Sequence, residues 1–91
     1  MNKLRPAGAI RWAAEIDGIV LLNDQTGKCI KLAYPQAALW DFITRGDSLK
    51  QITRKLALVA SLESAAAERL AAEAITLLMR DGFLLREGIH G

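Results

Sequence analysis

The hydrophobic pattern of this 91-residue chain changes its period at Tyr34-Pro35. Before this point, residues 10–15, 18–22 and 28–32 alternate between apolar and polar side chains, as half-buried strands do. After it, apolar residues recur three and four positions apart as far as Gly82, which is typical of helices. The sequence therefore predicts an α+β fold in which a three-stranded antiparallel sheet is followed by three helices.

Two turn signals connect the predicted strands. Asp17-Gly18 is a tight-turn dipeptide, and residues 23–27 are rich in residue types that tolerate left-handed backbone conformations. A meander of three strands has two edges, and the helices that follow it cannot cover both. An unpaired edge can accept an extended peptide as an added strand. This geometry favours a peptide-binding module over an enzyme.

The helices are delimited by turn and capping residues. Pro35 suits the first turn of a helix, and Gly46 ends that helix after about Arg45. Ser48 and Gln51 have the spacing of a capping box, which predicts the start of the second helix.

The third helix is predicted to begin at Ser61 or Ser64 and to close at Gly82, a glycine C-cap. Residues 83–86 are a candidate short strand. The chain is thus expected to form one domain, residues 10–86, between a flexible lead-in, residues 1–9, and a C-terminal tail, residues 87–91.

Composition narrows the classes of function. With 12 Lys and Arg against 10 Asp and Glu, the net charge of +2 is too small to imply nucleic acid or a membrane surface. No apolar run approaches the roughly 20 residues that span a bilayer. Residues 1–8 lack the apolar segment of a secretory signal, and one cysteine fits a reducing compartment. We expect a cytoplasmic protein.

Candidate catalytic and metal-binding residues are scarce. His90, the one histidine, lies close to the C-terminus, where ordered catalysis is not expected. Cys29 has neither a second cysteine nor a histidine near it in sequence, so neither a metal site nor a thiol nucleophile is supported. We therefore predict no enzymatic activity, no metal and no cofactor.

The third predicted helix has an apolar arc wider than the stripe of about 100° that a surface helix needs. Ala71, Ile75 and Leu78 lie on its core face, and Leu70 and Leu77 widen the arc on one flank. Either the helix is packed on both sides, or one flank lines an apolar groove beside the open strand edge, and both can hold. A narrow polar strip completes the surface: Arg69, Glu73, Thr76 and Arg80.

Lys28 and Lys31 flank Ile30 on the last predicted strand. Lysines on an edge strand discourage aggregation, which is one interpretation. The other is that they also attract acidic side chains of a bound peptide. The sequence leaves both open.

Several short motifs occur in a distinctive order: Thr26-Gly27-Lys28, Leu32, Ala38-Leu39-Trp40, residues 46–52, Leu56 and residues 78–84. Together they resemble the pyrroloquinoline quinone biosynthesis protein D family, the precursor-peptide recognition elements of ribosomal peptide natural products. The match covers roughly residues 10–86. It implies a winged-helix-like fold and a non-catalytic chaperone that binds the leader segment of a precursor peptide by strand addition.

The resemblance also implies a partner and a site. The chaperone would present the peptide to a maturation enzyme, either a radical S-adenosylmethionine enzyme or, in lasso peptide pathways, a leader protease. The peptide would lie between the third strand, residues 28–32, and the third helix, residues 65–81. The candidate peptide-binding residues are Lys28, Cys29, Ile30, Lys31, Leu32, Arg69, Leu70, Glu73, Ala74, Leu77 and Arg80.

Two other functions stay open at this point. A winged-helix DNA-binding regulator would share the fold, but its recognition helix should be plainly basic, whereas Arg69 and Arg80 are balanced by Glu73 with Glu68 nearby. A small subunit that only stabilises an enzyme would show no affinity for any free peptide. A homodimer is also left open.

Overall fold

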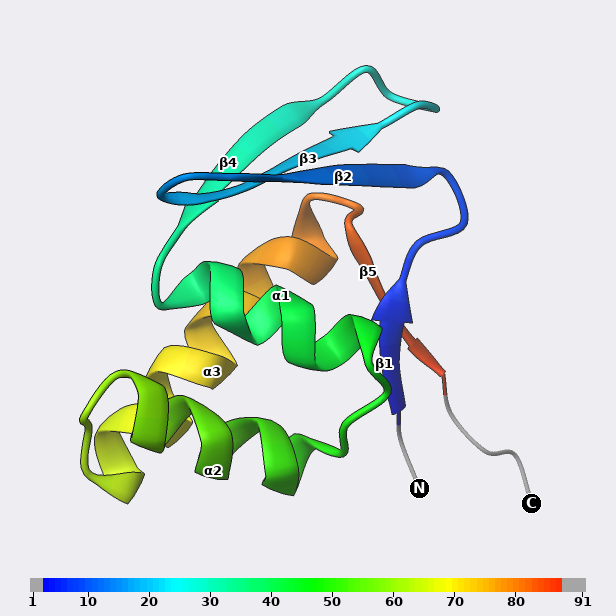
Figure 1. Cartoon of the computed structure of the whole chain (residues 1–91). Helices are drawn as coiled ribbons and strands as arrows, with labels where there is room; N and C mark the ends of the chain where they lie inside the picture. Colours follow the sequence, from blue (N-terminus) through cyan, green and yellow to red (C-terminus); the bar gives the residue numbers. More distant parts are fainter. Residues whose placement is uncertain (1–2, 88–91) are drawn as a thin grey trace.

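A three-stranded sheet lies across one side of three helices, and a two-stranded ribbon pairs the two ends of the described chain (Figure 1). The computed structural model describes residues 3–87. The elements in chain order are β1 (Lys3–Pro6), β2 (Ile10–Glu15), β3 (Gly18–Asn23), β4 (Cys29–Ala33), α1 (Gln36–Thr44), α2 (Leu49–Val59), α3 (Ser64–Arg80) and β5 (Leu84–Glu87). The predicted α+β class, with its three-stranded antiparallel sheet and three helices, is confirmed.

The sheet has the strand order β2-β3-β4, and both neighbouring pairs are antiparallel. Ile19 and Leu21 of β3 are buried, and they lie opposite Leu32 and Ile30 of β4. Because side chains alternate along a strand, these four share the face that packs against the helices. The intervening Lys31 lies on the outer face of the sheet.

Asn23 organises the turn between β3 and β4. Its Oδ1 accepts hydrogen bonds from the backbone N–H groups of Gln25, at 2.9 Å, and Thr26, at 3.3 Å. Gly27 completes the turn with a φ of 75°, a conformation that favours glycine. The Asn23 Nδ2 donates to the backbone carbonyl of Gly82 at 3.1 Å, so the same buried side chain joins the hairpin to the end of α3.

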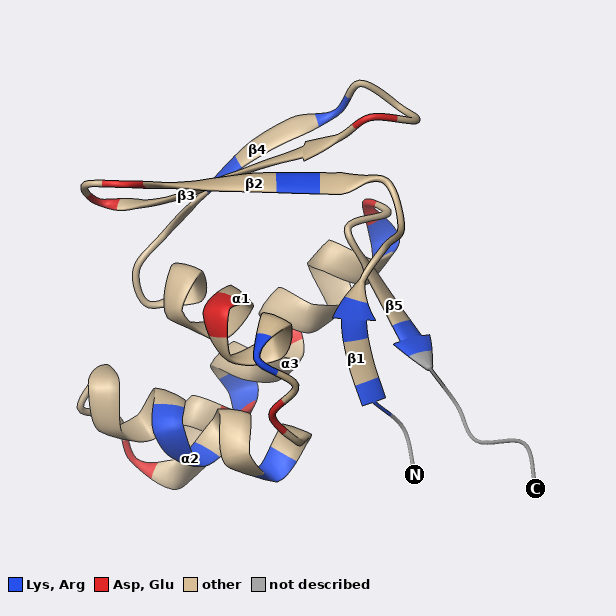
Figure 2. Cartoon of the chain, turned by 45° about the vertical axis from the view of Figure 1, so that its right-hand side comes forward, with Lys and Arg blue, Asp and Glu red and all other residues tan. Residues whose placement is uncertain are grey.

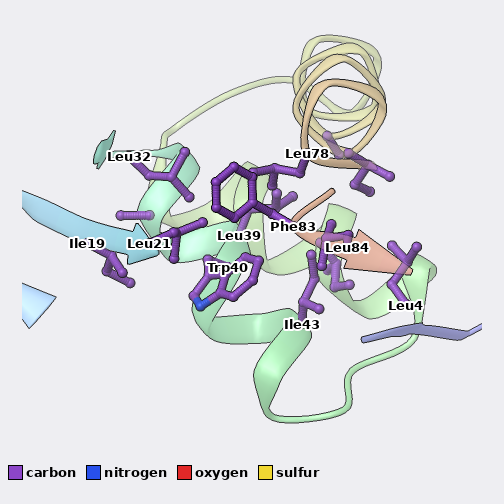
Figure 3. Packing of buried hydrophobic residues seen from close by; sticks show 14 of the residues in the cluster. Leu4, Ile19, Leu21, Leu32, Leu39, Trp40, Ile43, Leu78, Phe83 and Leu84 are labelled. Atoms are coloured by element: carbon purple, nitrogen blue, oxygen red, sulfur yellow. The ribbon is translucent and has the colours of Figure 1, made fainter. Parts of the chain in front are cut away.

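The N-terminal segment differs from the predicted lead-in. Lys3–Pro6 form β1, which pairs antiparallel with β5, the strand expected near residues 83–86. Leu4 is buried beside Leu84 (Figure 3). Four residues ending in a proline carry no local strand signal, and the pairing partner lies at the other end of the chain. Tertiary contact therefore specifies this strand rather than local preference.

The proposed tail, residues 87–91, falls almost wholly outside the described residues. Glu87 is the last residue of β5. His90 lies beyond the described part of the chain. The division into residues 1–9, 10–86 and 87–91 stays a prediction, except that Lys3–Pro6 of the predicted lead-in form β1.

Capping residues mark the start of α2 and the end of α3. The Ser48 Oγ accepts the Gln51 N–H at 3.2 Å, and the Gln51 Oε1 accepts the Ser48 N–H at 2.8 Å, which confirms the capping box of α2. Helix α3 begins at Ser64 and ends before Gly82, whose φ is 83°. Among residues 3–87, no helix is long and apolar enough to cross a membrane.

Phe83 occupies the centre of the core. Its ring lies between Leu32 of β4 and Leu78 of α3 (Figure 3), and it is fully buried. Trp40 of α1 is also fully buried and meets Trp12 of β2 edge-on, with ring centroids 5.6 Å apart.

Candidate functional site

Strand β4 forms a free edge of the sheet. It pairs with β3 on one side, and within residues 3–87 no strand pairs with its other side. Backbone N–H and C=O groups along such an edge can bind another extended chain. The expected unpaired edge is therefore present in the described structure.

The hydrogen-bond pattern shows which backbone groups of β4 are available. The Asn23 N–H donates to the Lys28 carbonyl at 2.9 Å. Because bonded and non-bonded pairs alternate in an antiparallel ladder, Ile30 and Leu32 are the residues of β4 that bond to β3. The backbone groups that point to the free edge belong to the other three residues of the strand: Cys29, Lys31 and Ala33.

The side chains of β4 alternate between the inner and the outer face of the sheet. Leu32 is buried, and Ile30 is half-buried against the core. Cys29 and Lys31 are exposed on the outer face, where the Cys29 thiol is free. The inner side chains therefore anchor the strand, while its outer edge remains open to a ligand.

Lys31 is engaged in ion pairs on the outer face of the sheet. Its Nζ lies 2.8 Å from Asp17 and 3.3 Å from Glu15, at the β2–β3 turn. The hydrogen bond from Lys31 lowers the pKa of the Asp17 carboxyl, and the same hydrogen bond raises the pKa of Lys31. The ammonium group therefore leans toward β2 and not toward the free edge.

Lys28 is also paired. Its Nζ lies 3.1 Å from the Asp81 Oδ1, at the C-terminal end of α3. Both lysines that the sequence places beside the peptide thus have internal carboxylate partners. Their contribution to attracting an acidic peptide is correspondingly smaller than an unpaired lysine would give.

The six helix residues predicted for the site lie on one flank of α3, because they are adjacent or three to four residues apart in the sequence. Leu70 and Ala74 are half-buried against the core. Leu77 leaves 43% of its surface exposed. The charged members of the flank are all exposed: Arg69, Glu73 and Arg80.

Two hollows follow this flank. The larger, of about 620 Å³, is lined by Tyr34 and Pro35 together with Arg69, Leu70 and Glu73. The smaller, of about 330 Å³, is lined mainly by α3 residues around Leu77 and Arg80 and shares Glu73 with the first. The two hollows are therefore neighbours along one side of the helix.

Contacts at both ends align β4 with this flank. Lys28, just before β4, meets Asp81 at the end of α3. Tyr34 and Pro35, just after β4, line the hollow beside Leu70 in the first half of α3. The strand and the helix therefore run in opposite directions. The larger hollow lies where Tyr34 and Pro35 meet the helix, whereas the smaller hollow is lined by α3 residues alone.

Sequence reasoning missed Tyr34 as a candidate site residue. Its ring is largely exposed at the rim of the larger hollow, next to Pro35. Val59, at the end of α2, is another exposed apolar residue on that rim. A large aromatic residue directly between a strand and a proline was the available signal, because such a side chain has no sheet face or helix face to pack on.

The described residues offer little for catalysis by a metal. No group of three or more His, Cys, Asp or Glu side chains within residues 3–87 could hold a metal ion.

Comparison with known proteins identifies the fold. No protein-family model matches this chain, and no curated protein sequence matches it. A solved structure of a lasso peptide synthetase B1 complexed with the leader peptide is similar, with a TM-score of 0.83 and 26% sequence identity. The similarity covers 91% of this chain and 98% of that one.

A second solved structure, TbiB1 in complex with the TbiA(beta) leader peptide, also has a TM-score of 0.83. Its 23% identity, over 96% of this chain and 99% of that one, is a likeness of fold alone. The resemblance that the sequence motifs indicated is confirmed by these structural neighbours.

Proposed function

We propose that this protein binds the leader segment of a ribosomally made precursor peptide as an added strand along the outer edge of β4. The observation that carries the proposal is the open edge, with the backbone groups of Cys29, Lys31 and Ala33 directed outward. The solved neighbour with 26% identity supports it, because that protein is itself complexed with a leader peptide.

The energetics indicate what the peptide must supply. A backbone hydrogen bond contributes about 1 kcal/mol net, whereas ordering one peptide residue costs about 1–2 kcal/mol. Strand addition alone therefore does not give useful affinity. Apolar side chains that fill the hollows along α3, at about 1.5–3 kcal/mol for each one fully buried, supply the rest. Three such side chains at the upper value give about 9 kcal/mol, close to the roughly 8 kcal/mol that micromolar binding needs.

The peptide is expected to carry these apolar residues at alternating positions. In an added strand, every second side chain faces the same side, so those on the helix side reach Leu70, Ala74 and Leu77. Tyr34 would close over a side chain in the larger hollow. The peptide-binding residues of β4 and α3 named from the sequence are retained in this proposal, with Ala33 and Tyr34 added.

The proposal assigns a non-catalytic role. The protein would hold a precursor and present it to a maturation enzyme, either a radical S-adenosylmethionine enzyme or a leader peptidase. Because a ribosomally made precursor is first available in the cytoplasm, we propose a cytoplasmic location for this protein.

A DNA-binding regulator is not favoured. The exposed charges of α3 include two cations, Arg69 and Arg80, and two anions, Glu68 and Glu73. A helix that enters a DNA groove needs an excess of positive charge to offset the phosphates.

A proline scan along β4 tests strand addition. Lys31→Pro removes an outward N–H without removing a bond to β3, whereas Ile30→Pro breaks the internal ladder. Lys31→Ala is the matched control for the lost side chain. The probe is a synthetic leader peptide, titrated by calorimetry, whose sequence is taken from a short precursor gene sought in the neighbourhood of this one.

Lys31→Pro is expected to weaken binding at least tenfold relative to Lys31→Ala, while circular dichroism shows both variants folded. If folded Lys31→Pro bound the leader as tightly as Lys31→Ala, strand addition at this edge would be wrong.

A further inference from the structure

A second groove runs between α2 and α3. Its volume is about 930 Å³, larger than either hollow along the flank of α3. Ala57 and Leu58 line it from α2, and Ala71 and Ile75 line it from α3. Leu58 leaves 75% of its surface exposed, although it is a large apolar residue. Contiguous apolar surface of this kind marks interaction sites in soluble proteins.

The rim of this groove is basic. Lys50 and Arg54 lie on it from α2, Arg86 lies on it from β5, and Glu68 is the one acidic residue among its lining. None of the three cations forms an ion pair with a residue in the described range 3–87. Figure 2 shows the basic segments along α2.

Unpaired cations distinguish this surface from the edge of β4. Lys28 and Lys31 are held by internal carboxylates, and so is Lys55 on α2, which lies 2.7 Å from Asp47. The cations around the second groove keep their full charge available for a partner. A ligand with carboxylates at its margins would complement them.

The second groove and the proposed leader site use different faces of α3, which meet at Ala72 and Thr76, because these two residues line both the second groove and the smaller hollow. At 3.6 residues per turn, Glu68, Ala71 and Ile75 face one side, while Leu70 and Leu77 face the other. A peptide held beside Leu70 and Leu77 would therefore leave the side of the second groove that faces α2 open. A presenting protein needs this arrangement, because it must contact its peptide and its enzyme at the same time.

We infer that the α2–α3 groove docks an acidic amphipathic helix of the maturation enzyme; this inference rests on the proposed function. A groove between two helices suits a third helix, which inserts apolar side chains at helical spacing. Helix α2 has 11 residues and is about 16 Å long, enough to contact about three turns of a partner helix. Leucines of that helix would cover Leu58 and Ala57, and its glutamates would meet Arg54 and Lys50.

A second copy of this chain is a poorer occupant. In a two-fold symmetric dimer the same patch faces itself, so groove against groove would bring Lys50, Arg54 and Arg86 close to their own copies. Glu68 alone cannot neutralise three cations on each side. Charge complementarity therefore selects an acidic partner.

The test uses the full chain, the leader peptide and a purified maturation enzyme sought in the same gene neighbourhood. Arg54→Glu should weaken enzyme binding at least tenfold at low salt. Glu68→Lys should strengthen it several-fold, because it makes the rim more basic. Leu58→Ser should weaken it at both low and high salt, since that contact is apolar.

Lys3→Glu, on β1 and outside both surfaces, is the matched charge-reversal control and should change nothing. Leader affinity, measured separately by calorimetry, should stay within twofold for all four variants. That readout tests the proposed function, so absence of leader binding in the unmodified protein would reject the function and not the groove.

Three results would overturn the inference. Enzyme binding could be unaffected by Arg54→Glu, or be weakened by Glu68→Lys. Alternatively, sedimentation could show a dimer that Leu58→Ser dissociates, in which case the groove joins two copies of this chain.

Discussion

Lys28 and Asp81 join the start of β4 to the C-terminal end of α3, with the Lys28 Nζ 3.1 Å from the Asp81 Oδ1. The Asp81 carboxylate is the less exposed partner, with 21% of its side chain exposed against 48% for Lys28. Next to this pair, Asn23 bonds to the Gly82 carbonyl. The two contacts hold the β3–β4 hairpin in place against the helix, so the free edge and the hollows of α3 keep a fixed spacing.

The Lys28–Asp81 pair is expected to contribute only modestly to stability. A partly exposed ion pair contributes at most about 1 kcal/mol. Lys28→Ala, Asp81→Ala and the double variant should therefore give a coupling free energy of that size in urea unfolding. A coupling above about 2 kcal/mol would mean that the pair behaves as a buried one.

Asn23 should matter more than the ion pair. It is 4% exposed and its side chain makes hydrogen bonds to Gly82, Gln25 and Thr26, so Asn23→Ala leaves backbone groups unpaired. Each such group costs about 1–3 kcal/mol when it is buried. We expect a loss of at least about 2 kcal/mol in the free energy of unfolding, measured in urea. A loss of less than about 1 kcal/mol would show that water replaces these bonds.

Leu77 should contribute to leader affinity without contributing much to stability. Leu77→Ala removes exposed apolar surface beside the smaller hollow, and partial burial of a leucine is worth about 1–2 kcal/mol. Calorimetry should show affinity roughly five- to thirty-fold weaker at any salt concentration. Leu85→Ala is the matched control, because Leu85 on β5 is also 43% exposed. If Leu77→Ala and Leu85→Ala weakened leader binding equally, Leu77 would not belong to the leader site.

The Lys31–Asp17 pair predicts a pH effect. The hydrogen bond from Lys31 holds the pKa of Asp17 below its ordinary value of 3.8, so Lys31→Ala should raise it. A lowered carboxyl pKa stabilises the fold above the unfolded-state pKa, and that stabilisation is lost as pH falls through the folded-state pKa. Carboxyl chemical shifts followed by pH titration would show the rise. An unchanged Asp17 pKa in Lys31→Ala would mean that the ion pair does not persist in solution.

Local patterns predicted most of the fold. The alternation in residues 10–32, the capping box at Ser48 and the glycine after α3 each depend on neighbours in sequence, and each is found where it was expected. Strand β1 was missed because it depends on pairing with β5 at the opposite end of the chain. Non-local pairing leaves no periodic trace in four residues.

The placement of the candidate site residues in the fold was predictable in outline and not in detail. Helical spacing brought Leu70, Glu73 and Leu77 to one flank of α3. The ion partners of Lys28 and Lys31 were not predictable, because Asp81 and Asp17 approach them only through the folded hairpin. The direction of each backbone amide in β4 also requires the register with β3.

Amide hydrogen exchange along β4 tests the proposed strand addition most directly. In the free protein, Ile30 and Leu32 should be protected by their bonds to β3, while Cys29, Lys31 and Ala33 exchange fast. With saturating leader peptide, these three amides should become protected as well. If they continued to exchange fast while Trp12 and Ala14, on the outer edge of β2, became protected, the peptide would be adding to the other side of the sheet, and binding along β4 would be contradicted.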